Sequence, residues 1–230
     1  AGIEAADSIV FNPHKWLGAQ FDCSVQFLRD PGAQVRTLGL RPTYLETAGR
    51  EEIVNRRIGR NELDTIQTLL AIVDAQREYA SADPDRNGFH DYARRFRSSP
   101  GKKDGLFWPV AAGEANSPMG PLIAAAAREG YGKGKADSGK PAAYHGYRYR
   151  ILTAQGRNAP GGAYSYLVKD RLIGGFAVVA YPVQHGSSGV MTFIVNHDGV
   201  VYQKNLGPGT EAAASKMRSY DPDASWKAVQ

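Results

Sequence analysis

Apolar side chains recur at helical spacing between Asn61 and Ala82. The positions that share one helix face are Leu63, Ile66, Leu69, Leu70, Val73 and Ala80. This pattern predicts an amphipathic helix roughly 30 Å long, at about 1.5 Å per residue. Asn61 is expected to cap the helix, and Glu62 and Asp64 to place negative charge at the positive end of its dipole.

The second half of the chain predicts a shorter helix followed by strands. The helix is expected from about Pro118 to Glu129, with Gly130 at its end. Alternation of apolar and polar residues predicts antiparallel strands, which are residues 147–151, 164–168, 172–181, 190–196 and 200–204. A long helix followed by such a sheet predicts an α+β fold, in which a long N-terminal amphipathic helix packs on the antiparallel sheet.

The strand region also predicts which face of one strand is charged and where two turns lie. In residues 147–151, tyrosine and isoleucine alternate with Arg148 and Arg150, so one face of the strand is apolar and the other is charged. His197-Asp198-Gly199 predicts a tight hairpin turn, because Asp-Gly tolerates the positive φ angles of such turns. The glycine-rich residues 156–162 predict a hairpin loop between two strands, since they lack the Lys-Ser/Thr of a phosphate-binding loop.

Composition places the chain among globular proteins. Of its 230 residues, 42% are hydrophobic and 22% are charged, which is sufficient for a buried core. The apolar runs at 122–127 and 176–181 are far shorter than the roughly 18 residues of a membrane span. One cysteine, Cys23, excludes an internal disulfide and a zinc site built from several thiolates.

Charge separates the chain into two parts near residue 50. Residues 1–50 carry five basic and five acidic side chains, and residues 51–230 carry 23 basic and 18 acidic ones. The whole net charge of +5 therefore lies in the second part. Residues 1–30 lack the pattern of a signal peptide, and the first residue is Ala1. We expect the chain to be a fragment or a processed product.

The opening residues lead through a turn to a lysine. Residues 8–11 are a short apolar run of strand type, Asn12-Pro13 predicts a turn, and Lys15 follows it. A lysine held at such a turn can form a Schiff base, whereas an isolated lysine is usually a solvated surface charge.

The ten residues from Asp7 to Trp16 resemble the lysine segment of the group II pyridoxal-phosphate-dependent amino-acid decarboxylases. The resemblance covers about residues 1–47. It implies a carboxy-lyase in which Lys15 binds pyridoxal phosphate and Asn12 and His14 lie near the cofactor's phosphate. In that family the cofactor is an electron sink, and other groups that hold it lie upstream of the lysine. We therefore expect a truncated decarboxylase-like segment with an incomplete cofactor site, and an inactive Lys15.

From Gly49 onward the decarboxylase resemblance ends and another begins. It is carried by the strings DAQREYA at 74–80, PGKKDGLFWP at 100–109, YHGY at 144–147, LTAQG at 152–156 and GVMTFIVN at 189–196. These resemble an uncharacterised family of bacterial exported proteins, domain of unknown function 2950. A weaker similarity links this part to the globular domains of type IV pilins and pseudopilins.

The two resemblances predict two domains. Residues 1–49 are expected to be the decarboxylase-like fragment, and residues 50–230 an α+β, pilin-like domain. The second family implies export to the periplasm or cell envelope, and the first implies the cytoplasm. The junction near residue 50 indicates a recent gene fusion or an assembly artefact, and the sequence leaves both open.

The loop after the predicted long helix carries oxygen ligands at alternate positions. Those that match positions 1, 3, 5 and 9 of a calcium-binding loop are Asp83, Asp85, Asn87 and Asp91. Gly88 stands at the sharp-turn position, but Arg94 replaces the bidentate glutamate, which excludes a complete EF-hand. Calcium binding and a plain polar turn both remain as interpretations.

A basic group interleaved with aromatic rings follows this loop. Its cationic members are Arg94, Arg95, Arg97, Lys102 and Lys103, and its rings are Tyr92, Phe96, Phe107 and Trp108. Such residues can bind nucleic acid, but acidic residues are mixed among them and no recognised nucleic-acid motif is present. A solvated surface is the better interpretation, and a nucleic-acid partner is not expected.

No catalytic set converges in residues 50–230 of the sequence. The histidines His90, His145, His185 and His197 are scattered, and neither HExxH nor GxSxG occurs. The leading hypothesis is a non-enzymatic exported or cell-envelope module with a binding or structural role. The alternatives are a decarboxylase segment that binds pyridoxal phosphate through Lys15, and a calcium-stabilised pilus-like or adhesion module.

Overall fold

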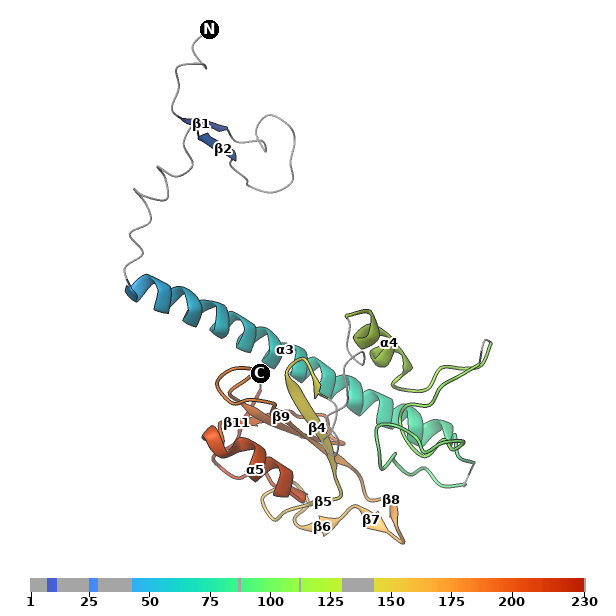
Figure 1. Cartoon of the computed structure of the whole chain (residues 1–230). Helices are drawn as coiled ribbons and strands as arrows, with labels where there is room; N and C mark the ends of the chain where they lie inside the picture. Colours follow the sequence, from blue (N-terminus) through green and yellow to red (C-terminus); the bar gives the residue numbers. More distant parts are fainter. Residues whose placement is uncertain are drawn as a thin grey trace. The chain divides into compact units, whose positions relative to one another are not determined.

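The computed structural model describes residues 8–11, 25–28, 43–86, 88–111, 113–129 and 143–229 (Figure 1). The chain divides into two units, Ala1–Ile53 and Val54–Gln230. In the first unit, β1 (Ser8–Phe11) pairs antiparallel with β2 (Val25–Leu28). The predicted cofactor residues Asn12, His14 and Lys15 lie outside the described residues.

The helix α3 (Thr43–Ala82) contains the predicted helix and ends at the predicted residue. Its predicted start is wrong, because the helix runs through Asn61 from Thr43. Asn61 is therefore no cap, and its side-chain amide instead donates a hydrogen bond to the carbonyl of Ser188 at 2.8 Å. Glu62 and Asp64 likewise lie inside the helix and away from its positive end.

The predicted apolar face of α3 is confirmed in part. Leu69, Val73 and Ala80 are buried as predicted, whereas Leu63 and Leu70 are 62% and 42% exposed. The buried face also includes three polar residues, namely Thr65, Thr68 and Gln76. Each of these side chains has a hydrogen bond, so a buried helix face can include them at little cost.

A six-stranded antiparallel sheet forms the centre of the second unit, in the order β13-β11-β10-β9-β4-β3. Its strands in chain order are β3 (Ala143–Tyr144), β4 (Tyr147–Leu152), β9 (Ala177–Pro182), β10 (Thr192–Asn196), β11 (Tyr202–Lys204) and β13 (Lys227–Ala228). Every residue of β9 and β10 is buried. The predicted turn between β10 and β11 is confirmed, with Gly199 at a φ of 86°.

Smaller sheets hold the remaining strands. β5 (Ala154–Gln155) lies between β6 (Tyr164–Ser165) and β12 (Ser219–Tyr220), and β7 (Leu167–Val168) pairs with β8 (Arg171–Leu172). The glycine-rich residues 156–162 connect β5 to its antiparallel partner β6, as predicted.

The single strand predicted at 172–181 is wrong. It is divided into β8 and β9, which lie in different sheets. Gly174 and Gly175 lie between them, and the φ of Gly175 is 137°, a backbone conformation that ends an extended strand.

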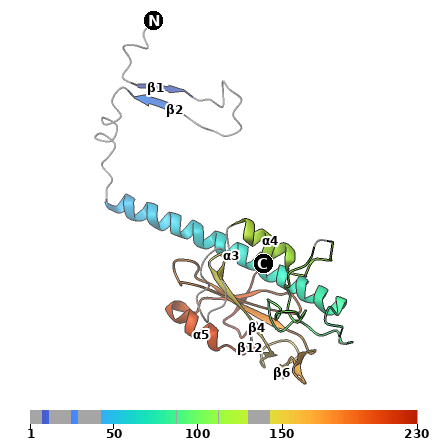
Figure 2. The same ribbon diagram turned by 45° about the vertical axis from the view of Figure 1, so that its right-hand side comes forward.

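The charged face of β4 is covered by other parts of the chain, with Arg148 buried and Arg150 half-buried. Arg148 is 6% exposed, and its Nη1 lies 3.4 Å from a carboxylate oxygen of Glu211. Arg150 donates from Nη2 to the carbonyl of Ala214 at 2.6 Å and also to that of Met217. These acceptors belong to or follow α5, which lies on the side of the sheet away from α3 (Figures 1 and 2).

The helices outside α3 are short. α5 (Thr210–Lys216) follows a 3-10 turn, η2 (Gly207–Gly209), and neither was predicted. α4 (Gly120–Arg128) occupies the predicted range, with Glu129 as its C-cap. Helices and antiparallel sheets together confirm the α+β class.

Candidate functional site

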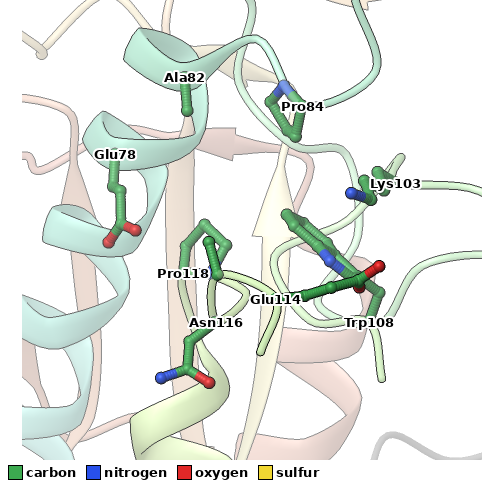
Figure 3. Close-up of a pocket in the computed structure, with 9 residues that line it drawn as sticks. Glu78, Ala82, Pro84, Lys103, Trp108, Glu114, Asn116 and Pro118 are labelled. Atoms are coloured by element: carbon green, nitrogen blue, oxygen red, sulfur yellow. The ribbon is translucent and has the colours of Figure 1, made fainter. Parts of the chain in front are cut away.

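A pocket of about 380 Å³ lies where α3 ends and the following loop returns to it (Figure 3). It is lined by Glu78, Ala82, Pro84, Lys103, Trp108, Glu114, Ala115, Asn116 and Pro118. We call this the Trp108 pocket. Its volume is within the range of small-molecule sites, roughly 300–1,000 Å³.

The indole of Trp108 forms an aromatic wall of the pocket. Trp108 is only 9% exposed, and the ammonium of Lys103 lies over its ring, 5.5 Å from the centroid. This is a cation–π arrangement, since the distance is below about 6 Å. The aromatic wall therefore already contacts one cation, which the chain itself supplies.

The backbone at Lys103 is fixed to α3. The buried phenol of Tyr79 donates a hydrogen bond to the Lys103 carbonyl at 2.8 Å. Burial raises the pKa of Tyr79 well above its usual value, and the nearby carboxylates of Asp85 and Asp91 raise it further. The phenol therefore stays protonated at neutral pH and keeps this donor.

Two carboxylates and an amide complete the polar lining. Figure 3 shows Glu78 on the side where α3 passes, and Trp108, Lys103 and Glu114 together on the other side. An oxygen of Glu114 accepts a long hydrogen bond of 3.4 Å from the amide of Ala111. Among the described residues, the exposed Glu78 carboxylate has no hydrogen-bond or ion-pair partner. The lining thus combines an aromatic face with groups that recognise charge.

A second cluster surrounds His145. Its Nδ1 lies 3.3 Å from Asp64 Oδ2, and its Nε2 lies 3.4 Å from Glu129 Oε2. These residues line a pocket of about 650 Å³ between α3, the end of α4 and the β3–β4 turn. Because each carboxylate contacts a different ring nitrogen, the imidazole stands between the carboxylates and joins three elements.

The predicted calcium ligands do not form a recognisable cation site in the described part of the chain. The carboxylate of Asp83 accepts a hydrogen bond from the Gly88 amide at 2.9 Å, and Asn87 lies outside the described residues. No group of three or more His, Cys, Asp or Glu side chains suited to a metal occurs among the residues that the structure covers. Calcium at Asp83, Asp85, Asn87 and Asp91 stays a prediction.

The basic group forms contacts within the chain. The guanidinium of Arg94 lies 3.2 Å from a carboxylate oxygen of Asp170, and that of Arg95 lies 3.9 Å from Asp104. The Arg97 guanidinium lies over the Phe107 ring at 5.9 Å. These cations are thus accounted for by neighbours on the protein surface.

The other histidines also have local structural contacts. His90 Nδ1 lies 2.8 Å from the Ala80 carbonyl, and His185 Nε2 lies 2.9 Å from the side-chain oxygen of Asn205. The ring of His197 lies edge-on to that of Tyr166, with centroids 5.8 Å apart. None of these contacts unites the predicted histidines in one site.

The sequence pattern indicates only part of the Trp108 pocket. Lys103 and Trp108 belong to the basic and aromatic group, whereas no pattern marks Glu78, Glu114 or Asn116 as site residues. The PGKKDGLFWP string could have drawn attention to the loop, because its proline and glycine residues bring a lysine and a tryptophan close together. Nothing local indicates that α3 supplies the opposite wall.

Two families match the sequence. Residues 43–229 match a family described as "Protein of unknown function (DUF2950)", and residues 1–65 match the pyridoxal-dependent decarboxylase conserved domain. Both resemblances drawn from the sequence are confirmed. No solved structure matches the chain. None of the described helices combines the length and hydrophobicity needed to cross a bilayer.

The curated relatives are decarboxylases that match a short stretch. Aromatic-L-amino-acid decarboxylase of Drosophila melanogaster is 51% identical over 45 residues, which is 20% of this chain and 9% of that protein. Histidine decarboxylase of the same species is 51% identical over 45 residues, 20% of this chain and 5% of that protein. Tyrosine/DOPA decarboxylase 2 of Papaver somniferum is 40% identical over 50 residues, with coverages of 22% and 9%. The chain thus spans less than a tenth of the length of each of these relatives.

Proposed function

Because the chain belongs to the family of proteins of unknown function DUF2950, we propose that residues 50–230 are a non-enzymatic module that binds a ligand in the Trp108 pocket. The observation that carries this proposal is the pocket lining. An indole face, two carboxylates, one ammonium and one amide meet there, and the remaining residues are alanine and proline. An apolar surface with a few placed polar groups is typical of a recognition site.

Several charged side chains of the second unit, Val54–Gln230, make structural contacts, which supports a non-enzymatic role. Glu62 accepts hydrogen bonds from two backbone amides, and Arg148 and Arg150 hold α5 against β4. The proposal therefore assigns these side chains to the architecture and recognition to the Trp108 pocket.

We extend the proposal to the arrangement and location of the chain. The two family matches overlap at residues 43–65, and we place the junction near residue 50, with a decarboxylase-like segment before it and the DUF2950 domain after it. The resemblance to exported bacterial proteins supports a place in the periplasm or cell envelope for residues 50–230.

The test is a titration of the full chain followed by the indole N–H resonance of Trp108 in NMR spectra. Trp108→Phe assigns this resonance against those of Trp16 and Trp226. The probes are n-butylammonium chloride, methyl glucoside and sodium acetate, which are cationic, neutral and anionic. A saturable shift with at least one probe is expected. No shift with any of them overturns binding at this pocket, and consumption of a probe overturns the non-enzymatic role.

A second candidate function is pyridoxal phosphate binding through Lys15. It is favoured by the decarboxylase match over residues 1–65, which includes Asn12, His14 and Lys15. The bound cofactor would supply an electron sink for decarboxylation. The full chain is mixed with pyridoxal phosphate and its visible absorption is compared with that of Lys15→Ala. A band that needs Lys15 supports this function, and identical spectra reject it.

A further inference from the structure

We propose that the Trp108 pocket takes an organic cation, namely a primary ammonium or guanidinium group on an aliphatic arm. This inference rests on the proposed function and names the ligand class for the same site.

The ring face of the Trp108 indole already contacts an ammonium. The Nζ of Lys103 lies 5.5 Å from the ring centroid, and Trp108 is 9% exposed. A cation is attracted to the negative face of an aromatic ring, most strongly to that of tryptophan. A ligand ammonium that joins or displaces Lys103 gains the same interaction.

The charges of the pocket lining favour a cation. Glu78 and Glu114 oppose one ammonium, that of Lys103, so the lining carries a formal charge of −1. Within the described residues the Glu78 carboxylate is unpaired, and it lies across the pocket from the indole (Figure 3). A cation placed between them satisfies the carboxylate, whereas an anion would meet two like charges.

The apolar part of the lining indicates an aliphatic arm on the ligand. Ala82, Pro84 and Pro118 lie beside the charged groups. Methylene groups can pack on these residues while the cationic end reaches the carboxylates, as the stems of lysine and arginine do on protein surfaces. A hydrated inorganic cation would gain nothing from this part of the lining.

Lys103 gives the inference a sharp test, because it competes for the indole face. Lys103→Met keeps an unbranched apolar side chain, removes the resident ammonium and leaves the lining with two carboxylates. We expect this variant to bind n-butylammonium about two- to five-fold more tightly, the size of one exposed cation–π contact. Glu78→Gln is expected to weaken binding by a similar factor, since it removes the unpaired charge.

The experiment measures the dissociation constant from the Trp108 indole resonance in the full chain, at constant ionic strength. n-Butylammonium is compared with acetyl-Gly-Lys-Gly-amide, so that a free amine and a lysine side chain are distinguished as sources of the cation. Asp74→Asn is the matched control, because Asp74 is an exposed carboxylate of α3 that does not line the pocket, and its affinity should equal that of the parent chain. Unchanged thermal unfolding midpoints verify that all variants are folded.

The outcomes separate the ligand class from the binding function. Saturable binding of either cation, tightened by Lys103→Met and weakened by Glu78→Gln, supports the inference. If methyl glucoside or acetate binds and n-butylammonium does not, the proposed ligand class is overturned but the binding function is kept. Weaker cation binding by Lys103→Met also overturns the inference. If no probe shifts the Trp108 resonance, both the ligand class and the binding function are rejected.

Discussion

The carboxylate of Glu62 holds α3 against the segment that leads into β10. Its Oε1 accepts hydrogen bonds from the backbone amides of Val190 at 2.9 Å and Met191 at 3.0 Å. The buried phenol of Tyr147 donates to the Met191 carbonyl at 2.9 Å and lies 3.5 Å from the same carboxylate. One side chain thus satisfies two backbone donors of a distant segment.

Replacing Glu62 by an apolar residue of similar length should leave those two amides without an acceptor. We expect Glu62→Met to lower the free energy of unfolding by about 1–2 kcal/mol, the lower part of the cost of an unsatisfied buried donor, because these two amides are only partly buried. Denaturant unfolding measures the change. Asp74→Asn, at a side chain that is 76% exposed, should stay within about 0.5 kcal/mol of the parent. A loss no larger than that control would show that the Glu62 contacts are dispensable.

Asp104 predicts a dependence of stability on pH. Partial burial by itself favours the neutral acid, but hydrogen bonds from the Ser99 amide and hydroxyl, with the nearby Arg95, hold the pKa of Asp104 below its usual value of 3.8. A carboxyl with a lowered folded-state pKa stabilises the protein above its unfolded-state pKa, and this contribution is lost as pH falls through the folded-state value.

Asp104→Asn should therefore melt at a lower temperature than the parent at pH 7. The difference should shrink as the pH is lowered below 3.8, where the parent carboxyl also becomes neutral. Thermal unfolding at a series of pH values measures the gap between the two proteins. A gap that is the same at neutral and acidic pH would contradict an electrostatic origin.

Among the elements, the β3–β4 turn combines an unusual backbone with close packing. His145 and Gly146 have φ angles of 48° and 74°, which suit a two-residue hairpin. A Cβ at Gly146 would lie 2.8 Å from the side-chain nitrogen of Asn61 and 3.0 Å from the Cβ of Ser188. The turn therefore requires glycine for its backbone and also for the approach of α3.

Gly186 offers a matched control for this turn. Its φ is 77°, but a Cβ there would meet no atom within 4 Å. We expect Gly186→Ala to cost about 1–2 kcal/mol for the left-handed backbone, and Gly146→Ala to cost at least about 1 kcal/mol more for the crowding. The difference between the unfolding free energies of the two variants measures the cost of crowding at Gly146. Equal losses would mean that α3 moves aside without cost.

Elements were predictable where the signal lies within one segment. Apolar periodicity located the end of α3, the extent of α4 and the positions of β4, β10 and β11. It located only part of the buried face of α3, because Thr65 and Gln76 are buried with backbone hydrogen-bond partners that no helical pattern reveals. In β4 it identified a charged face but not what covers that face, because α5, which contacts Arg148 and Arg150, was not predicted.

At the scale of the whole molecule, the candidate site was the least predictable feature. Lys103 and Trp108 are neighbours in the sequence, but the wall that carries Glu78 comes from α3 and Asn116 comes from a later part of the loop. Such a site depends on how the loop folds back on the helix. Residue types alone indicated only a basic and aromatic surface.

The two-part organisation can be tested by truncation. Within the described residues, the buried apolar cluster extends from Leu69 to Trp226. A chain that begins at Thr43 keeps all of this cluster, so its thermal midpoint should lie within about 2 °C of the full chain, less than the shift expected for 1 kcal/mol. A drop of more than about 4 °C, or loss of a single cooperative transition, would count against an independent second domain.

The borders of the large sheet affect the behaviour of the folded protein at high concentration. In the part of the chain that the structure describes, β3 and β13 are the outermost strands, and each is two residues long. Amyloid-like growth starts from long unpaired strand edges, and these borders offer a neighbouring molecule very short templates. The fully buried strands β9 and β10 are each enclosed on both sides by other strands. Aggregation by β-pairing at this sheet should therefore require its unfolding first.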